Sequence, residues 1–274
     1  MPARQNPSRH RTGRLLIAAP IPALAIDRVS RSFGGVEATS DVSFVVPEGA
    51  VCALVGPNGA GKTTLFNLIT NLFPANSGTI AFYGQPLAGL APAAIARLGL
   101  IRTFQAARVF PGLTVLENAQ IGSHRLLGQT LWSSMLRLPG QRREERGLQD
   151  RARRLLALVG LLAQQHTHAT ALPMGAQKML EIVRALMAQP RLLLLDEPAA
   201  GLNDTETAEL ADLLRAIRDI GITVLLVEHN MPLVMGVADQ VIVLEAGRLI
   251  ASGPPAQIRT DPRVIAAYLG AEAA

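Results

Sequence analysis

The sequence predicts an α/β protein whose mainly parallel sheet is covered by helices on both faces. Short apolar runs typical of buried strands alternate along the chain with stretches that repeat apolar residues at the helical period. A glycine-rich loop at residues 56–64 lies between one such strand and a helix, and Asp196 and Glu197 directly follow another strand. Ligands of open parallel sheets gather where strands end at their carboxyl edge, so both features predict a binding site there.

The composition limits the class of protein. The chain has 274 residues, enough for one large α/β domain, and 49% of them are hydrophobic while only 4% are aromatic. We therefore expect a core built mainly of Leu, Ala, Val and Ile. No window approaches roughly 18 uninterrupted apolar residues, so we do not expect the chain to span a membrane by itself. The single cysteine, Cys52, excludes an internal disulfide and suits a reducing compartment.

The first residues differ in charge from the rest of the chain. Four arginines precede residue 15, and the first acidic residue is Asp27. The remainder is nearly neutral, which excludes a basic body that binds nucleic acid. We expect residues 1–20 to be a disordered basic extension, or to result from a start codon placed too early. A secretory signal is rejected because the apolar part runs straight into a strand. The domain then covers residues 21–274.

The first part of the chain predicts mostly strands. Glu48 and Gly49 make a tight turn between two of them. Phe33 falls in the loop after the first strand. An aromatic ring there can stack on a purine, although a lone Phe more often packs, so spacing alone leaves both interpretations open. The expected strands are residues 24–29, 42–46, 50–55 and 77–83.

From residue 100 onward the pattern is mainly helical. Thr114 has the character of a helix N-cap, and residues 122–149 interrupt the compact pattern as an insertion with a charged run. The elements expected after it are a helix at 150–162, a helix at 175–187, a strand at 192–195, a helix at 205–220, a strand at 222–227, a hairpin of 241–244 with 248–251, and a helix at 262–269.

The glycine-rich loop reads Gly-Pro-Asn-Gly-Ala-Gly-Lys-Thr-Thr and matches the phosphate-binding pattern G-x-x-x-x-G-K-[ST]. Glycines let successive backbone N–H groups turn inward toward phosphate oxygens, and the next helix adds its positive N-terminal end. Lys62 is placed to reach the β and γ phosphates, and the Thr63 hydroxyl to bind a bridging Mg²⁺. The expected contacts are Gly56, Pro57, Asn58, Gly59, Ala60, Gly61, Lys62, Thr63 and Thr64.

Polar groups follow two further strands, and we expect them to converge with the loop. Asp196 suits a carboxylate that holds Mg²⁺, and Glu197 suits a general base or water-orienting group for hydrolysis. His229 is placed to hydrogen-bond a γ-phosphate and to sense its loss. Taken singly, Asp196 and Glu197 could cap a helix and His229 could be a satisfied core residue. The phosphate loop favours the functional interpretation.

Together these motifs resemble the ATPase subunits of ABC transporters. The resemblance rests on the phosphate loop, on residues 172–203 with the run Asp-Glu-Pro-Ala-Ala-Gly-Leu-Asn at their end, and on Glu228-His229. It covers nearly everything from Leu24 to Gly270. It implies a P-loop NTPase fold with a mainly parallel core sheet, an antiparallel β subdomain, and an inserted α-helical subdomain at residues 106–180 that contains the insertion.

The resemblance also implies roles for single residues. Phe33 corresponds to the aromatic that stacks on adenine. Gln105 corresponds to the Q-loop glutamine, which contacts magnesium and faces the membrane subunit. Asp196 ends the Walker B strand, Glu197 is the catalytic glutamate and His229 the switch histidine. The catalytic candidates are thus Glu197, His229 and Gln105, and the metal candidates are Thr63, Gln105 and Asp196.

The family signature falls at residues 172–177 and departs from its usual form. Leu-Ser-Gly-Gly-Gln is replaced by Leu-Pro-Met-Gly-Ala followed by Gln177, so the serine that would bind the γ-phosphate of the opposite nucleotide is missing. Leu172, Gly175 and Gln177 remain as candidate nucleotide contacts, with the N–H groups of the following helix able to bind phosphate. Asn203 replaces the commoner aspartate of the D-loop.

A finer resemblance is to the longer ATPase subunit of branched-chain amino-acid importers, carried by residues 102–105, 114–118, 198–203 and 261–265 and by the insertion. It implies an ATP-hydrolysing subunit that uses ATP and Mg²⁺ and lies peripherally on the cytoplasmic face of the inner membrane. The implied partners are integral-membrane permease subunits, a second ATPase subunit bound head to tail as a copy or a homologue, and indirectly a solute-binding protein. Nucleic acid is not among them.

Three alternatives stay open. Importers of urea or other amides share much of this pattern, and substrate identity belongs to the binding protein and the permease. The altered signature suggests a regulatory subunit with little turnover, although Glu197 and His229 oppose that interpretation. A soluble ABC ATPase acting on nucleic acid would need a long coiled-coil insertion or tandem halves and a basic face, which the sequence lacks.

Overall fold

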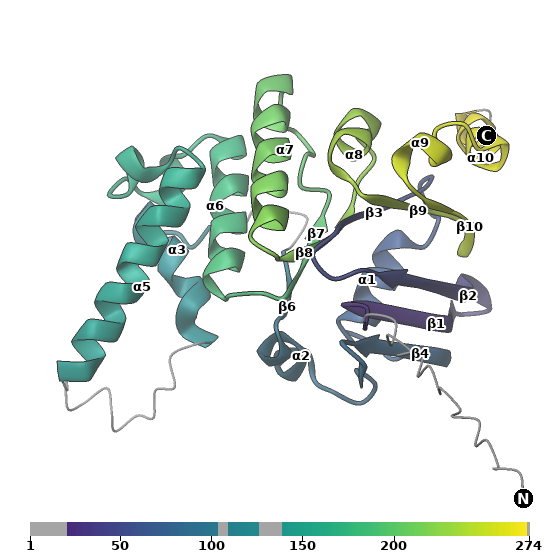
Figure 1. The fold of residues 1–274 in the computed structure, drawn as a ribbon, viewed down its shortest axis with the longest axis horizontal. Coiled ribbons are helices and arrows are strands. Elements are labelled where there is room, and N and C mark those ends of the chain that lie inside the picture. Colours follow the sequence, from purple (N-terminus) through teal and green to yellow (C-terminus); the bar gives the residue numbers. More distant parts are fainter. Residues whose placement is uncertain (1–20, 104–108, 126–138, 273–274) are drawn as a thin grey trace, which may run out of the picture.

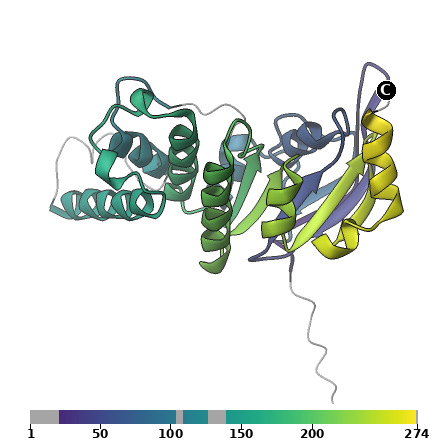
Figure 2. The same cartoon turned by 90° about the horizontal axis from the view of Figure 1, so that it is seen from above.

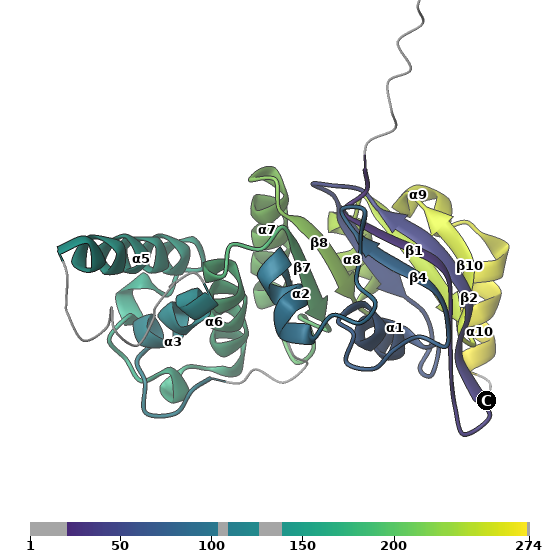
Figure 3. The ribbon, with the colours of Figure 1, turned by 90° about the horizontal axis from the view of Figure 1, so that it is seen from below.

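The computed structural model describes residues 21–103, 109–125 and 139–272. A helical part lies at one end of the molecule and a part built on two sheets at the other (Figure 1). Figures 2 and 3 show the same division from above and from below. Throughout the described ranges, every helix is too short or too polar to cross a bilayer.

The core sheet has six strands in the order β10-β9-β3-β8-β7-β6. Strands β6, β7, β8, β3 and β9 pair in parallel, and β10 joins β9 as an antiparallel hairpin. Three of them, β3, β7 and β8, are buried along their whole length. The strands are β3 (Val51–Val55), β6 (Leu100–Arg102), β7 (Leu192–Asp196), β8 (Thr223–Val227), β9 (Gln240–Glu245) and β10 (Arg248–Gly253).

Alternate residues of the central strands enter two separate cores. Leu193 and Leu195 of β7 belong to the core formed with the helices on one face, whereas Leu192 and Leu194 belong to the core on the other face. A strand buried on both sides needs an apolar residue at every position, which explains the unbroken apolar runs in the sequence.

A second, antiparallel sheet covers one of these faces in the order β2-β1-β4-β5. Its strands are β1 (Leu24–Phe33), β2 (Val36–Val46), β4 (Ser77–Phe82) and β5 (Gln85–Pro86). Helix α1 (Lys62–Ile69) shares a core with both sheets through Leu65 and Phe66, which are fully buried. The mainly parallel core sheet and the antiparallel β subdomain confirm the expected fold.

The first hairpin corrects the expected end of the first strand. Strand β1 runs on to Phe33 instead of ending at residue 29, so Phe33 is the last residue of a strand and not part of a loop. It pairs with Val36 across the two-residue turn Gly34-Gly35, where both glycines have positive φ. Such turns match the twist of paired strands. The pairing was not evident because bulges interrupt the alternation of buried and exposed residues along β1.

The helical part contains α3 (Val115–Ile121), α5 (Pro139–Leu158) and α6 (Met174–Met187). Thr114 caps α3 in a reciprocal capping box with Glu117, as the sequence predicts for its N-cap. Helix α5 begins at Pro139 rather than at residue 150, because the charged run, in which Arg143, Glu145 and Arg146 are exposed, is part of the helix. Residues 126–138 of the expected insertion lie outside the described residues. Among the described residues of this part, short 3₁₀ turns follow α3 at Gly122–Arg125 and connect α5 to α6 at Leu162–Gln164 and Ala169–Ala171.

The remaining helices flank the core sheet (Figure 1). Helices α7 and α8 pack on the face opposite the antiparallel sheet, where Leu214 and Val234 enter the same core as Leu193. Helix α8 was not predicted, although Asn230 caps it and a proline occupies its first turn. The bounds are α2 (Pro92–Leu98), α7 (Asp204–Asp219), α8 (Met231–Val237), α9 (Pro255–Ile258) and α10 (Pro262–Glu272).

Candidate functional site

The phosphate loop connects β3 to α1 and is shaped by glycines that no other residue can replace. Gly56 and Gly61 have φ of 151° and 96°. A Cβ atom at Gly56 would collide with the carbonyl oxygen of Leu244, and one at Gly61 with that of Ala38. The loop therefore lies against the backbones of β9 and β2. Its backbone can approach these two strands so closely only because neither position carries a side chain.

Lys62 folds back over its own loop. Its Nζ donates hydrogen bonds to the carbonyl oxygens of Gly56 at 2.7 Å and Pro57 at 2.9 Å. Burial lowers the pKa of Lys62, and the negative charges of Glu197 and Asp196 oppose that shift. The ammonium thus occupies the inside of the loop, where phosphate oxygens are expected, and it is within electrostatic reach of both acidic side chains.

Strand pairing brings the predicted acidic residues to the loop. Asp196 at the end of β7 pairs with Val227 at the end of β8, and Val227 pairs with Leu54 of β3, just before the loop. The backbone N–H of Glu197 donates to the carbonyl oxygen of Val227 at 2.9 Å. His229 follows β8 by two residues and is exposed. The carboxyl edge of three adjacent strands therefore carries the loop, the acidic pair and the histidine.

Arg102 is a member of this site that we did not predict. Its Nη2 donates to Oδ2 of Asp196 and its Nη1 to Oδ1 of Asn67 in α1, each at 2.7 Å. The sequence places a basic residue at the end of β6, beside β7, but the partner is 94 positions away. Only the strand order reveals the pairing.

Glu228 was predicted only as part of a motif, yet it is fully buried at the centre of the site. Its Oε1 accepts from the N–H of Ala199 at 2.7 Å, and its Oε2 from the N–H groups of His229 at 3.0 Å and Asn230 at 3.1 Å. One carboxylate therefore fixes the turn after Glu197 and the backbone of His229. The available signal was a charged residue placed directly after a buried apolar strand.

The signature segment lies apart from the phosphate loop. Figures 1 and 3 show α6, which begins in the segment, and α1 on either side of β7 and β8. Leu172 is buried, and its carbonyl oxygen accepts from Nε2 of Gln177 at 2.8 Å. Gly175 faces the carboxylate of Glu206, which a Cβ atom at Gly175 would displace. Asn203 caps α7 and forms a capping box with the same Glu206.

Comparisons with known proteins decide the family. The sequence model of the ABC transporter family matches residues 39–200. The chain is an ATP-binding protein of the ABC transporter family. A second model, described as a branched-chain amino acid ATP-binding cassette transporter, matches residues 248–274. ATP hydrolysis coupled to transport is the activity of this family, and this ABC ATPase binds ATP.

Individual relatives agree with that assignment. The high-affinity branched-chain amino acid transport ATP-binding protein LivG of Salmonella typhimurium is 44% identical over 91% of this chain and 98% of its own. The corresponding protein BraF of Pseudomonas aeruginosa is 42% identical over 91% of this chain and 98% of its own. A solved ATP-binding cassette of an ABC transporter in its ADP conformation superposes with a TM-score of 0.78 at 30% identity, over 91% of this chain and 99% of that one.

The adenine-stacking candidate of this ABC ATPase is the last residue of β1, beside the turn to β2. The Phe33 ring packs edge-on against Phe73 with centroids 5.1 Å apart, and the guanidinium of Arg31 lies 4.7 Å from its centroid. Phe33 is nevertheless 42% exposed. Packing and an accessible ring surface therefore occur together. Gln105, the Q-loop candidate, lies outside the described residues.

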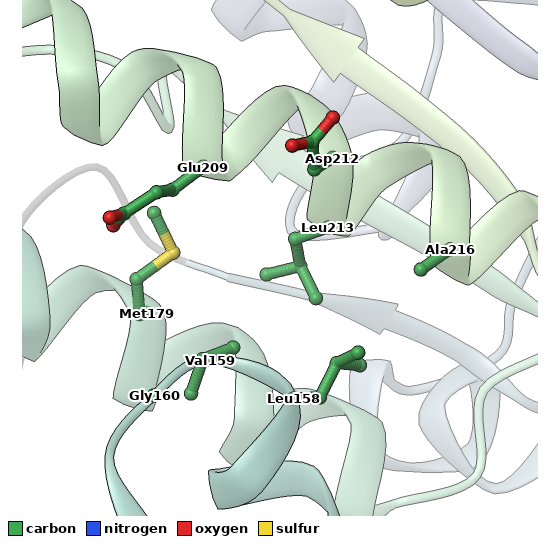
Figure 4. A pocket seen from close by; sticks show the side chains of 8 residues that line it. All are labelled: Leu158, Val159, Gly160, Met179, Glu209, Asp212, Leu213 and Ala216. Atoms are coloured by element: carbon green, nitrogen blue, oxygen red, sulfur yellow. The ribbon is translucent and has the colours of Figure 1, made fainter.

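A separate pocket of about 470 Å³ lies between the helical part and α7 (Figure 4), and no residue of the phosphate loop lines it. Most of its lining residues are apolar, and the two acidic ones, Glu209 and Asp212, are exposed and form its acidic rim. Arg215 pairs with Asp212 at 2.7 Å, so part of that acidic rim is already neutralised. The residues that line it are Leu158, Val159, Gly160, Met179, Glu209, Asp212, Leu213 and Ala216.

Proposed function

We propose that this ABC ATPase drives the import of branched-chain amino acids, as the peripheral subunit on the cytoplasmic face of the inner membrane. The observation that carries the proposal is the carboxyl edge of β3, β7 and β8, where Lys62 lies within electrostatic reach of Asp196 and Glu197. His229 follows the end of β8 at the same edge, and this grouping supports ATP hydrolysis. The substrate class rests on the described relatives and on the match at residues 248–274.

Hydrolysis in this site is mainly positioning and charge neutralisation. Lys62 exchanges its two loop carbonyl partners for phosphate oxygens when ATP binds. Glu197, next to the end of β7, orients the attacking water and accepts its proton. His229 contacts the γ-phosphate from the end of β8. Because these groups stand on the ends of buried strands, little reorganisation is needed at the moment of reaction.

The side chains present fit a magnesium ion. Among the described residues, hydrogen bonds engage only Oδ2 of Asp196, which leaves Oδ1 for a cation. Thr63 supplies an exposed hydroxyl at the start of α1, and Gln105 is the third proposed ligand. Carboxylate, hydroxyl and amide oxygens are the ligands that Mg²⁺ prefers. When bound, the ion neutralises charge on the β and γ phosphates.

The signature segment supports a second ATPase subunit as partner. Leu172, Gly175 and Gln177 lie apart from the loop of their own chain, and we propose that they contact the nucleotide held by the partner in a head-to-tail pair. The pair, formed by two copies or by homologues, acts on integral-membrane permease subunits that receive the amino acid from a solute-binding protein.

The experiment that tests this function is ATP hydrolysis by the purified chain, alone and with its candidate partner ATPase and permease, beside Glu197→Gln. We expect weak hydrolysis alone, stimulation in the complex, and loss in the variant. A wild-type chain that binds ATP but stays silent in the complex would favour the regulatory subunit, with the altered signature as its cause. Uptake of leucine compared with urea by the reconstituted complex tests the substrate class.

A further inference from the structure

A buried lysine of helix α6 binds the turn that carries Glu197. Lys178 is 8% exposed. Its Nζ donates hydrogen bonds to the carbonyl oxygens of Glu197 at 3.5 Å and Pro198 at 3.4 Å, and to that of Ala200. One ammonium group therefore gathers three carbonyl groups of a single turn. It does so about one helical turn after the start of α6.

A buried carboxylate binds a backbone N–H group of the same turn. Glu228 accepts the N–H of Ala199, while Lys178 binds carbonyl groups on both sides of that residue. Burial lowers the pKa of Lys178, and the carboxylates of Glu228, Glu181 and Glu197 act against that shift. The turn is therefore enclosed between a cation and an anion that attract each other in a poorly solvated place.

The choice of lysine at this position is informative. Of the 26 basic residues in the chain, only Lys62 and Lys178 are lysines. The other 24 are arginines. Both lysines direct their ammonium groups at clusters of backbone carbonyl oxygens. A compact ammonium can donate to several oxygens around one point, whereas a guanidinium is a planar fork.

Glu197 needs such support because its backbone is in an unfavourable conformation. Its φ is 48°, in the left-handed region that residues other than glycine rarely adopt. Its N–H is held by the carbonyl oxygen of Val227, and its carbonyl oxygen accepts from the N–H of Ala200 at 3.2 Å and from Lys178. The direction of the Glu197 side chain follows from this backbone conformation, so these contacts bear on where its carboxylate lies.

We propose that Lys178 is a positioning residue for ATP hydrolysis, which holds the Glu197 turn in its left-handed conformation and ties that turn to α6. This inference rests on the proposed function, in which Glu197 orients the attacking water. Helix α6 begins in the signature segment. If the signature segment moves when nucleotide binds, the Lys178 side chain therefore transmits that movement to Glu197 of the same chain.

The test compares Lys178→Met, which keeps the length of the side chain and removes its charge, with Lys178→Arg and Arg151→Met. Arg151 is the matched control because it also donates to a carbonyl oxygen of α6, that of Leu186 at 3.1 Å, at the far end of the helix. Steady-state ATP hydrolysis by the full-length chain in its transporter complex gives kcat and KM, and direct titration gives ATP affinity.

We expect Lys178→Met to lower kcat about tenfold or more while ATP affinity stays within about twofold. The kcat of Lys178→Arg should lie between those of wild type and Lys178→Met, and the kcat of Arg151→Met should equal that of wild type. Because Lys178 acts through Glu197, adding Lys178→Met to Glu197→Gln should cause no further loss in single-turnover hydrolysis. An additional loss in the double variant, or a normal kcat in folded Lys178→Met, would overturn the proposal.

If Lys178→Met does not fold, Lys178→Arg decides by the same criteria: a lower kcat at constant affinity supports the inference, and an unchanged kcat overturns it. Failure of the proposed function is seen separately. In that case the wild-type complex does not hydrolyse ATP, or Glu197→Gln hydrolyses it normally, before any Lys178 variant is measured.

Discussion

Arg102 and Asp196 form an ion pair with 2.7 Å between Nη2 and Oδ2, and their side chains are only 14% and 7% exposed. The same guanidinium binds Asn67 in the helix that follows the phosphate loop. One side chain thus joins the ends of β6 and β7 to α1. This contact fixes the carboxylate that is proposed to hold magnesium relative to the loop that is proposed to hold phosphate.

Arg102→Met should destabilise the protein by about 3 kcal/mol, because it leaves the carboxylate of Asp196 buried without its cation. Chemical denaturation followed by circular dichroism measures the loss. Adding Asp196→Asn should recover part of it by removing the unpaired charge. Arg218→Met, which breaks pairs with Asp219 and Asp239 at the surface, should cost less than about 1 kcal/mol. Equal losses for the two arginines would contradict the prediction.

Gly61→Ala should abolish ATP binding and lower stability by more than about 2 kcal/mol, because a Cβ atom there meets the backbone of Ala38 at a positive φ. The matched control is Gly89→Ala. Gly89 also has a positive φ, of 77°, but open space around it, so only the conformational cost of about 1 kcal/mol remains. Nucleotide titration and denaturation measure both effects, and retained ATP affinity in Gly61→Ala would refute the close approach of the loop to β2.

Cys52 should make stability depend on alkaline pH. Burial, with a smaller contribution from Asp239, raises the pKa of its thiol from 9.0 to about 12. The unfolded chain loses this proton first, so the stabilisation is complete below pH 9 and declines as the pH rises toward about 12.

The measurement is the free energy of unfolding of wild type and Cys52→Ala at about pH 8 and about pH 10.5. Wild type should lose about 2 kcal/mol more than the variant over this range, since one pH unit corresponds to about 1.4 kcal/mol. Other groups that titrate there are common to both proteins and cancel. Parallel pH curves would show that the thiol is not shielded.

Asn203 should act as a helix cap whose replacement by aspartate is tolerated. Its side chain accepts from the N–H of Glu206 at 2.9 Å, a contact that aspartate reproduces. Asn203→Ala should cost about 1 kcal/mol and Asn203→Asp nearly nothing. Thermal unfolding of the two variants checks this. A comparable loss in both would mean that the amide nitrogen, and not the cap, is what matters.

Local patterns predicted the parts of the fold that depend on local physics. Residues close in sequence determine three of these features: the phosphate loop, the buried strands around Leu193 and Leu225, and the N-cap Thr114. The expected convergence of the loop with Asp196 and His229 needed one further rule, that parallel strands end at a common edge.

The features that the sequence did not predict depend on contacts between residues that are far apart in the chain. The pairing of Arg102 with Asp196 follows from the order of β6 and β7, and the burial of Glu228 from the turn that folds over it. The early start of α5 was missed because charged residues such as Glu145 break the apolar period without breaking the helix. Phe33 was placed in a loop because bulges hid its strand.

The contact between Gly175 and Glu206 has an evolutionary consequence. A side chain at position 175 has no room while the carboxylate at position 206 remains in its capping box. The two positions are therefore coupled, because a bulkier residue at the first displaces the carboxylate at the second and removes the hydrogen bond that it accepts from the N–H of Asn203. Drift in the signature segment is thus restricted by a helix cap on another element, independently of any nucleotide.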